Sequence, residues 1–216
     1  MFKINEFLSN FNLRIEKIST NQNLYDVLNF LFLKLDIDTL FDIGANEGQF
    51  AKKIRSAGYS KKIISFEPIN GIHQKLKKNS KKDQNWLAEN FAIGEKDGDA
   101  VINVSNYSLS SSILQMSKIH LDAKESSKYI SSQNVAIKKI DTYIKEKNYD
   151  NNNLFLKIDT QGTEYDIIKG AQNNIQNIRG ILCELSLSEL YLGQKLWLEI
   201  IEDLTSKNFE IWYLEK

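Results

Sequence analysis

From residue 39 onward, short apolar stretches alternate with longer segments in which apolar residues recur every three or four positions. Residues 39–41 and 62–66 form continuous apolar runs, which is typical of buried strands. Residues 49–58 place their apolar side chains on one helical face, and a second helix is predicted near residues 70–82. Strands that alternate with helices indicate a parallel sheet.

The same alternation continues to the end of the chain. Further strands are predicted at residues 86–93, 100–104, 135–140, 154–158, 181–185 and 209–214, and further helices at residues 164–171 and 197–204. A short helix begins near Asp141, which we expect to be its N-cap because a side-chain oxygen there accepts from free helical amides. The pattern predicts an α/β, Rossmann-like fold with a mostly parallel central sheet and helices on both faces.

Two segments do not follow this alternation. Residues 1–37 carry apolar side chains at helical spacing and are predicted to form an N-terminal helical cap on the sheet edge, with a partner-binding or dimer face as the alternative. Residues 38–216 then form a single globular unit. Residues 105–134 hold ten serines and only scattered apolar residues. Such an insertion is usually a functional lid or a disordered loop, and we favour a lid over a bound substrate.

Composition narrows the function classes. The 216 residues carry 28 basic and 28 acidic side chains, so the chain lacks the basic body expected of a nucleic-acid binder. The one cysteine, Cys183, excludes an intramolecular disulfide, and its apolar surroundings favour a buried thiol over a nucleophile. The sequence shows no apolar run of membrane-spanning length and no signal-peptide pattern. We therefore expect a cytoplasmic protein.

The candidate chemistry begins in the turn of residues 42–48, which joins the first strand to its helix. Gly44 and Gly48 are expected to permit unusual dihedrals and close approach of a ligand, and the amides at the helix start favour a polar group. A phosphate-binding loop needs Lys-Ser or Lys-Thr after its last glycine, and a dinucleotide fingerprint needs Gly-x-Gly-x-x-Gly. Neither pattern is present. An S-adenosylmethionine site, with Asp42 entering a Gly-x-x-x-Gly turn, fits better than either, and an ordinary α/β turn stays open.

The second predicted strand ends in Glu67-Pro68. An acid at this position is suited to a ribose, because a carboxylate accepts hydrogen bonds from two neighbouring hydroxyls. Pro68, the chain's single proline, keeps Glu67 extended at the strand tip. We therefore predict that Glu67 binds a nucleoside ribose.

Two later strands also end in carboxylates. Asp159 follows the apolar run at residues 154–158, and it should face the glycine turn because ligands of open α/β sheets bind beyond the carboxyl ends of the strands. Glu184 is predicted to be buried within the strand at residues 181–185, which is costly without a partner. Glu184 is thus either a site residue or a paired structural acid.

With these residues placed, the chain resembles the FkbM-type S-adenosylmethionine-dependent methyltransferases from about Leu40 to Leu214. The resemblance rests on ordered motifs, of which Lys-Ile-Asp-Thr-Gln-Gly-x-Glu at residues 157–164 is the most specific. The others are Phe-Asp-Ile-Gly-Ala-Asn-Glu-Gly at 41–48, Phe-Glu-Pro at 66–68, Ala-Ile-Gly at 92–94, Ser-Ser-Ser at 110–112, and Glu184 followed by Tyr-Leu-Gly-Gln at 191–194.

The resemblance implies a seven-stranded methyltransferase fold and O-methylation of a sugar, glycan precursor or other secondary metabolite, with S-adenosyl-L-methionine as cofactor. It implies three sets of site residues. The cofactor set is Asp42, Gly44, Ala45, Asn46, Gly48, Glu67, Pro68, Asn90, Phe91, Ala92 and Asp159, of which Phe91 and Ala92 lie at the adenine. The substrate set is Ser110, Ser111, Ser112, Lys157, Gln161 and Tyr191. The catalytic set is Asp159, Glu184 and Glu164, in that order of preference as base.

Some expectations differ from this family or stay open. Family members continue past the last predicted strand, whereas this chain ends at Lys216, so the sheet edge is expected to be open, covered by a partner such as a second copy, or formed by the N-terminal segment. Of the two histidines, His73 is expected to be exposed and His120 could reach a substrate. No metal is assigned, although Asp159 and Glu184 could hold one. A non-catalytic nucleoside-binding or interaction protein that retains the methyltransferase fold is the alternative function, and a nicotinamide-dependent oxidoreductase is a distant third.

Overall fold

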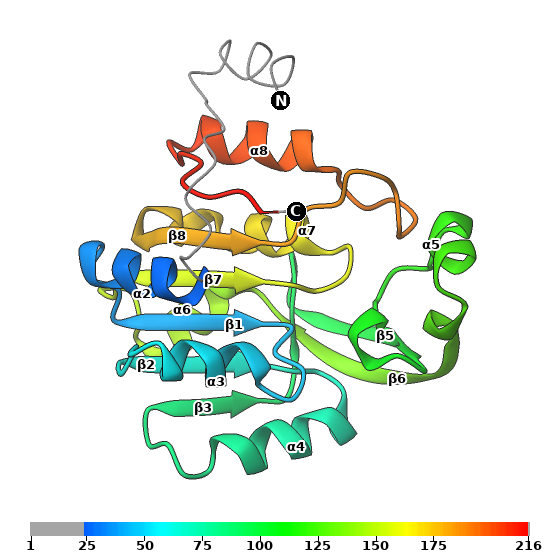
Figure 1. Cartoon of the computed structure of the whole chain (residues 1–216), viewed down its shortest axis with the longest axis horizontal. Helices are drawn as coiled ribbons and strands as arrows, with labels where there is room; N and C mark the ends of the chain where they lie inside the picture. The colour runs from blue at the N-terminus through cyan, green and yellow to red at the C-terminus, as the bar shows by residue number, and fades with distance from the viewer. Residues whose placement is uncertain (1–23, 216) are drawn as a thin grey trace.

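The computed structural model describes residues 24–215, apart from the side chain of Ser108, and its main feature is a five-stranded parallel sheet (Figure 1). The strand order is β3-β2-β1-β7-β8. The strands are β1 (Thr39–Ile43), β2 (Lys62–Phe66), β3 (Trp86–Glu89), β7 (Leu154–Ile158) and β8 (Ile178–Cys183). β1 lies at the centre, paired in parallel with β2 and β7. The α/β, mostly parallel, Rossmann-like architecture is therefore confirmed, with five strands in this sheet where the resemblance implied seven.

A smaller three-stranded sheet lies beside the carboxyl ends of the main strands (Figure 1). It consists of β4 (Ala92–Ile93), β6 (Tyr129–Lys138) and β5 (Gly98–Ser105). The prediction of one strand over residues 86–93 was wrong, because the chain turns at Asn90, whose side-chain amide donates to the backbone carbonyls of Glu67 and Pro68. β4 then leaves the main sheet and pairs with β6.

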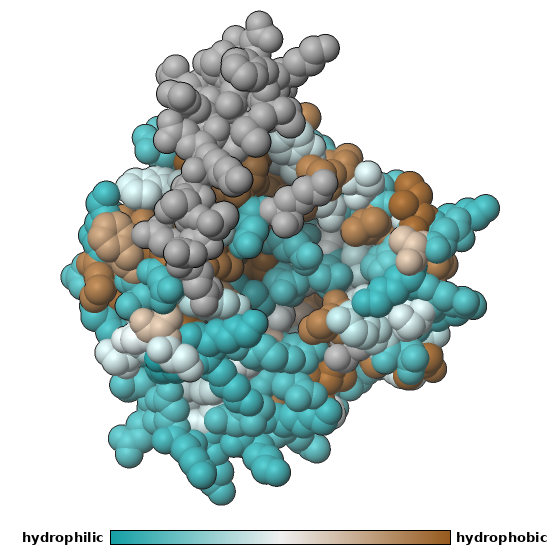
Figure 2. Space-filling view, viewed as in Figure 1, coloured by the Kyte–Doolittle hydropathy of each residue, from teal (hydrophilic) through white to brown (hydrophobic). Residues whose placement is uncertain are grey.

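Helices cover both faces of the main sheet. One core packs α2 (Leu24–Lys34), α3 (Gln49–Ser56) and α4 (Asn70–Ser80) against one face. A second core packs α6 (Ile140–Lys147), α7 (Glu164–Lys169) and α8 (Trp197–Ser206) against the other. Alternate strand residues feed the two cores, as the period of two along a strand requires. The lysine-rich outer side of α4 forms part of the hydrophilic surface in the lower half of Figure 2.

The described part of the N-terminal cap lies on a sheet face, not at its edge as predicted. Leu28 and Phe32 of α2 are buried, and the ring of Phe32 packs 4.6 Å from that of Phe155 in β7. β7 is an inner strand, which places α2 over the middle of the sheet. The helix predicted within residues 2–15 lies outside the described residues.

The serine-rich insertion is shorter and more ordered than the sequence indicated. β6 begins at Tyr129, not at residue 135, because its polar residues 131–134 pair antiparallel with β5. The part between these strands contains η1 (Ser108–Ser110), α5 (Lys118–Ala123) and η2 (Glu125–Ser127). Pairing with a distant strand cannot be recognised from a local hydrophobic pattern, which explains the error. Whether this insertion acts as a lid stays a prediction.

Two further local predictions were wrong. Asp141 is not the N-cap of α6; that position is Lys139, and the Asp141 carboxylate instead accepts from the backbone amides of Asn173 and Asn174 at the start of η3 (Gln172–Asn177). Residues 209–214 form no strand. Phe209 packs on the core, and the exposed ring of Trp212 lies against the Lys34 ammonium of α2.

Candidate functional site

A cleft opens at the carboxyl ends of β1, β2 and β7, where the small sheet faces the main one. The space that the centre of a water-sized sphere can occupy in it is about 80 Å³. The glycine turn, the tip of β2 and the loop after β7 supply its polar side, including Glu67 and Asp159. Its apolar side includes Ile102, Leu109 and Ile113 from the small sheet and the insertion. The cleft therefore lies where Asp159 was predicted to face the glycine turn.

Parallel register explains the charged cluster below this cleft. Asp42 of β1 pairs with Ser65 of β2 and with Lys157 of β7, so the three side chains share one face of the sheet. The Asp42 carboxylate accepts from the Ser65 hydroxyl at 3.0 Å and lies 3.3 Å from the Lys157 ammonium. The Trp86 indole N–H donates to the Ser65 hydroxyl, which completes a buried chain of three groups.

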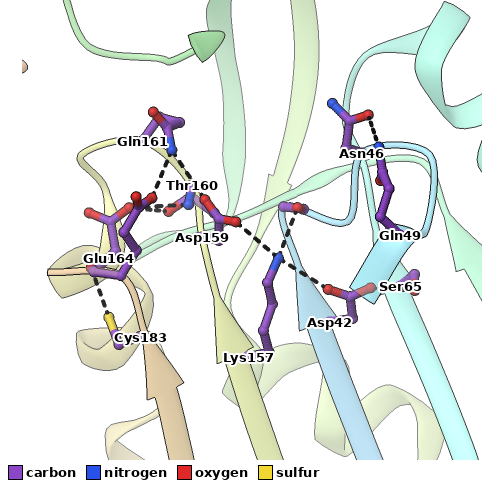
Figure 3. A network of polar contacts seen from close by, with 12 residues as sticks. Asp42, Asn46, Gln49, Ser65, Lys157, Asp159, Thr160, Gln161, Glu164 and Cys183 are labelled. Carbon is purple, nitrogen blue, oxygen red and sulfur yellow. Dashed lines mark hydrogen bonds and ion pairs between the residues drawn. The ribbon is translucent and has the colours of Figure 1, made fainter. Parts of the chain in front are cut away.

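Lys157 joins two carboxylates (Figure 3). Its ammonium lies 3.4 Å from Asp159 and donates to the carbonyl of Gly44 at 3.2 Å. Although burial disfavours the ammonium, the carboxylates of Asp42 and Asp159 raise the pKa of Lys157. Burial raises the pKa of Asp42, and Lys157 opposes that shift. Lys157 was predicted to bind substrate, but it lies beneath the cleft and holds Asp159 against the end of β1.

The glycine turn is built for internal packing. Gly44 has φ +75°, and a Cβ there would meet the carbonyl oxygen of Asp159 at 1.9 Å; a Cβ on Gly48, with φ +86°, would meet the Trp86 ring at 2.6 Å. The amides of Gly44 and Ala45 both donate to the Phe66 carbonyl. Internal packing is therefore enough to require both glycines, and the role expected of the amides at the start of α3 stays a prediction.

Glu67 lies at the tip of β2 with its side chain turned into the site. One carboxylate oxygen accepts from the Asn46 amide at 3.0 Å and the other from the Ile69 amide at 2.9 Å. Each oxygen keeps a further lone pair for a ligand donor. The residue is 5% exposed, and burial raises the pKa of Glu67 to about 7, against the lowering effect of those two amides. A charged Glu67 is thus poorly stabilised by the protein alone.

The motif at residues 159–164 folds into a tight loop. Gln161 has φ +62° and Gly162 has φ +106°, so both lie in the left-handed region. The Glu164 carboxylate accepts from the backbone amides of Thr160 and Gly162, at 3.1 and 3.0 Å, and so closes the loop (Figure 3). Glu164 was the third choice as base, but its buried carboxylate is committed to these amides.

Gln161 connects the two remaining carboxylates. Its side-chain amide nitrogen donates to Asp159 at 3.1 Å and to Glu184 at 2.9 Å, and its amide oxygen accepts from the Tyr191 hydroxyl at 2.9 Å. Glu184 is not buried within a strand as predicted, since β8 ends at Cys183 and the Glu184 side chain is exposed. Partial desolvation and the nearby Asp159 charge raise the pKa of Glu184 to about 7.

The three consecutive serines have different positions. Ser111 lines the cleft. Ser112 is buried and its hydroxyl donates to the Gln161 carbonyl at 2.6 Å, while the buried Ser110 hydroxyl pairs with that of Ser127. Ser112 therefore attaches the insertion to the loop after β7, whereas the Ser110 side chain is held within the insertion. The buried Tyr191, also predicted to bind substrate, faces Gln161.

The remaining predicted cofactor residues are divided between cleft and core. Pro68 and Ala92 line the cleft, whereas Phe91 packs against the rings of Phe66 and Tyr143. Asn90 shapes the turn after β3. Sequence reasoning missed Ser65, Trp86 and the cleft-lining residues Thr160, Ile69 and Ile102. The register of β2 relative to Asp42 could have identified Ser65. Thr160 could have been identified because it lies within the motif at residues 157–164.

The histidines lie outside this cluster of carboxylates. His73 is half-buried on α4, not exposed as expected. His120 is buried with its ring edge-on to Tyr191, and burial lowers the pKa of His120. Burial also raises the pKa of Cys183, which agrees with an unreactive thiol.

Within residues 24–215, no three His, Cys, Asp or Glu side chains are placed to hold a metal ion. The helices in that range are too short or too polar to cross a membrane.

Comparisons with known proteins agree with this geometry. A family model described as the Methyltransferase FkbM domain matches residues 42–211. Among curated proteins, the chain is 28% identical over 172 residues to the 2-O-methyltransferase NoeI of Sinorhizobium fredii (strain NBRC 101917 / NGR234), covering 76% of this chain and 70% of that protein. A solved structure described as a "putative caffeoyl-CoA O-methyltransferase" from Staphylococcus aureus is 15% identical with a TM-score of 0.27, over 41% of this chain and 42% of that one. That last likeness is too slight to support a conclusion.

Proposed function

Because this chain belongs to the FkbM methyltransferase domain family, we propose that it is an S-adenosylmethionine-dependent O-methyltransferase. The acceptor we propose is a hydroxyl of a sugar, glycan precursor or secondary metabolite. The name of the relative, a 2-O-methyltransferase, supports oxygen as the methylated atom. We keep the prediction of a cytoplasmic location.

The observation that carries this proposal is that Glu67 and Asp159 line the same cleft. Glu67 is buried and its charge is poorly stabilised, so two ribose hydroxyls would supply the donors that it needs. The apolar residues Ile69, Ala92 and Ile93 line the same cleft and suit the flat face of a base. The residues present therefore fit a nucleoside cofactor.

When bound, S-adenosylmethionine supplies an electrophilic methyl group on a positively charged sulfur. We propose that Asp159 accepts the proton of the acceptor hydroxyl as the oxygen attacks, because its half-exposed carboxylate opens into the cleft. Lys157 and Gln161 hold that carboxylate from two sides, at 3.4 and 3.1 Å. Holding the base in place contributes to catalysis by alignment. Glu184 is the second choice as base, and its raised pKa suits proton transfer near neutrality.

The first test is calorimetric titration with S-adenosylhomocysteine, with NAD as the control ligand. We expect micromolar binding of the first alone, and NAD binding alone would instead indicate an oxidoreductase. Transfer of a labelled methyl group to a panel of neutral glycosides and other alcohols would then identify the acceptor. Binding without transfer to any acceptor would favour a non-catalytic nucleoside-binding protein.

A substitution separates binding from chemistry. Asp159→Asn keeps the size of the side chain and removes the base, so we expect turnover to fall by about 10²- to 10⁴-fold, the usual contribution of a general base. The affinity for S-adenosylhomocysteine should change much less. Turnover equal to that of the wild type would exclude Asp159 as the base.

A further inference from the structure

The side-chain amide of Gln161 has a partner on every side. Its nitrogen donates to two carboxylates, Asp159 and Glu184, and its oxygen accepts from the Tyr191 hydroxyl. An amide has two donor hydrogens on nitrogen, and here both are used. The Gln161 backbone carbonyl is also occupied, by the hydroxyl of Ser112.

This arrangement matches one orientation of the amide. Rotating the amide by half a turn would place its oxygen against two carboxylates, which is repulsive, and would remove both donors from them. The hydroxyl of Tyr191 favours the productive orientation because it donates to the amide oxygen at 2.9 Å, whereas its alternative acceptor, the Ser110 carbonyl, lies farther away at 3.4 Å. As one carboxylate gains a proton during a reaction, its own preference for the amide donor weakens, and the tyrosine then becomes the group that keeps the amide in place.

We propose that Tyr191 is a positioning residue, whose hydroxyl orients the Gln161 amide so that this amide donates to both Asp159 and Glu184. The proposal assigns Tyr191 a role different from substrate binding, and as a contribution to methyl transfer it rests on the function proposed above. Asp159 is the group that faces the acceptor, while Tyr191 acts on it through Gln161.

Tyr191 is itself rigidly held. It is 2% exposed, and its ring lies so close to the loop after β7 that a Cβ on Gly162 would meet ring atoms at 3.1 Å. The His120 ring packs edge-on to it at 5.0 Å between centroids. Its backbone amide donates to the Gln194 side chain at 2.6 Å, and its backbone bridges to Met116 of the insertion. A hydroxyl held this firmly can impose an orientation on a flexible glutamine.

The charges around Glu184 show why the amide donors matter. Asp159 and Glu164 both act on Glu184 as like charges, and the Gln161 amide opposes them. The Lys157 ammonium lies 3.4 Å from Asp159, on the side of that carboxylate away from Gln161 and Glu184. Without the amide donors, less would oppose the repulsion that Glu184 experiences, and Glu184 would keep its proton to a higher pH.

A titration without cofactor or acceptor tests the inference directly. Protein labelled with ¹³C at the glutamate side-chain carboxyl is titrated by NMR, and the Glu184 signal is assigned by its loss in Glu184→Gln. In the wild type we expect a midpoint near pH 7. Tyr191→Phe should raise this midpoint by roughly one unit, the scale of one lost charged hydrogen bond. Tyr129→Phe is the matched control, because that hydroxyl donates to the Leu114 carbonyl instead.

A second variant, Gln161→Leu, tests whether Tyr191 acts on Glu184 through Gln161. Gln161→Leu alone should raise the Glu184 midpoint, and adding Tyr191→Phe to it should cause no further change. The proposal is overturned if Tyr191→Phe leaves the midpoint unchanged, or if it shifts the midpoint equally in the Gln161→Leu protein. Should Tyr191→Phe fail to fold, an unchanged midpoint in Gln161→Leu overturns it alone. A wild type that does not bind S-adenosylhomocysteine would refute the proposed function and leave these titrations valid.

Discussion

The pKa of Glu67 leads to a sharp prediction about cofactor affinity. Only the ionised carboxylate can accept hydrogen bonds from two ribose hydroxyls on both of its oxygens while keeping the Asn46 and Ile69 amides. Because burial raises the pKa of Glu67 to about 7, protonation competes with the cofactor at physiological pH. Binding should therefore release a proton and strengthen as the pH rises.

The size of the change in affinity with pH follows from the pKa of Glu67. With a pKa of about 7, about one tenth of Glu67 is ionised at pH 6 and about nine tenths at pH 8. If the ligand binds only the ionised form, its affinity rises about tenfold between these values and is flat above pH 8. Replacing the carboxylate by an amide removes both the charge and the pH dependence. We expect Glu67→Gln to bind about 10- to 100-fold more weakly, the scale of one charged hydrogen bond.

Calorimetry with S-adenosylhomocysteine at pH 6, 7 and 8 measures the affinity, and repeating it in buffers of different ionisation enthalpy counts the protons released. S-adenosylhomocysteine is the better probe because it lacks the sulfonium charge, which would also interact with Asp159 and Glu184. Glu184→Gln is the matched control, since its pKa is likewise raised to about 7, and it should keep the wild-type slope. A flat profile in the wild type, or an unchanged slope in Glu67→Gln, would refute the assignment of Glu67 to the ribose.

The remaining predictions concern stability. Gly44→Ala should lower the free energy of unfolding, measured by urea titration, by more than about 2 kcal/mol, because φ is +75° and the new methyl would meet the Asp159 carbonyl. Gly71→Ala is the control. Nothing lies within 4 Å of a Cβ at that position, so the substitution should be neutral or stabilising in the same titration. Lys157→Met should cost about 3–5 kcal/mol by leaving Asp42 buried without its cation. This cost should be larger at pH 8 than at pH 5, since protonation of Asp42 relieves it, and equal costs would contradict the ion-pair explanation. Lys195→Met, in an exposed pair with Glu199, should leave the unfolding midpoint unchanged.

The sequence predicted the parts of the fold that depend on local pattern. β1, β2 and β7 are short apolar runs with strong boundaries, and each was located to within two residues. Their parallel pairing followed from the alternation with helices. The same reasoning placed Asp159 beside the glycine turn, where the Asp159 amide donates to the Ile43 carbonyl.

What the sequence could not supply are relations between distant residues. The polar residues 131–134 form part of β6 only because β5 is available to pair with them. Glu184 follows an apolar run and was taken as buried, but the strand stops one residue before it. The Gln161 contacts join residues 159, 184 and 191 through a loop with left-handed dihedrals, and hydrophobic periodicity carries no signal for such a loop.

The hydrogen bond from Trp86 to Ser65 gives this protein a built-in optical reporter. The indole of Trp86 is 5% exposed and connects through the Ser65 hydroxyl to Asp42 at the base of the cleft. Trp212, by contrast, is 56% exposed beside Lys34. Indole emission responds to the polarity and hydrogen bonding around the ring. In a Trp197→Phe protein, which removes the third, half-buried tryptophan, a solvent quencher such as iodide should suppress Trp212 and leave the light from Trp86. Spectral changes that survive quenching would then follow events at the carboxyl end of β1 in unlabelled protein, in real time.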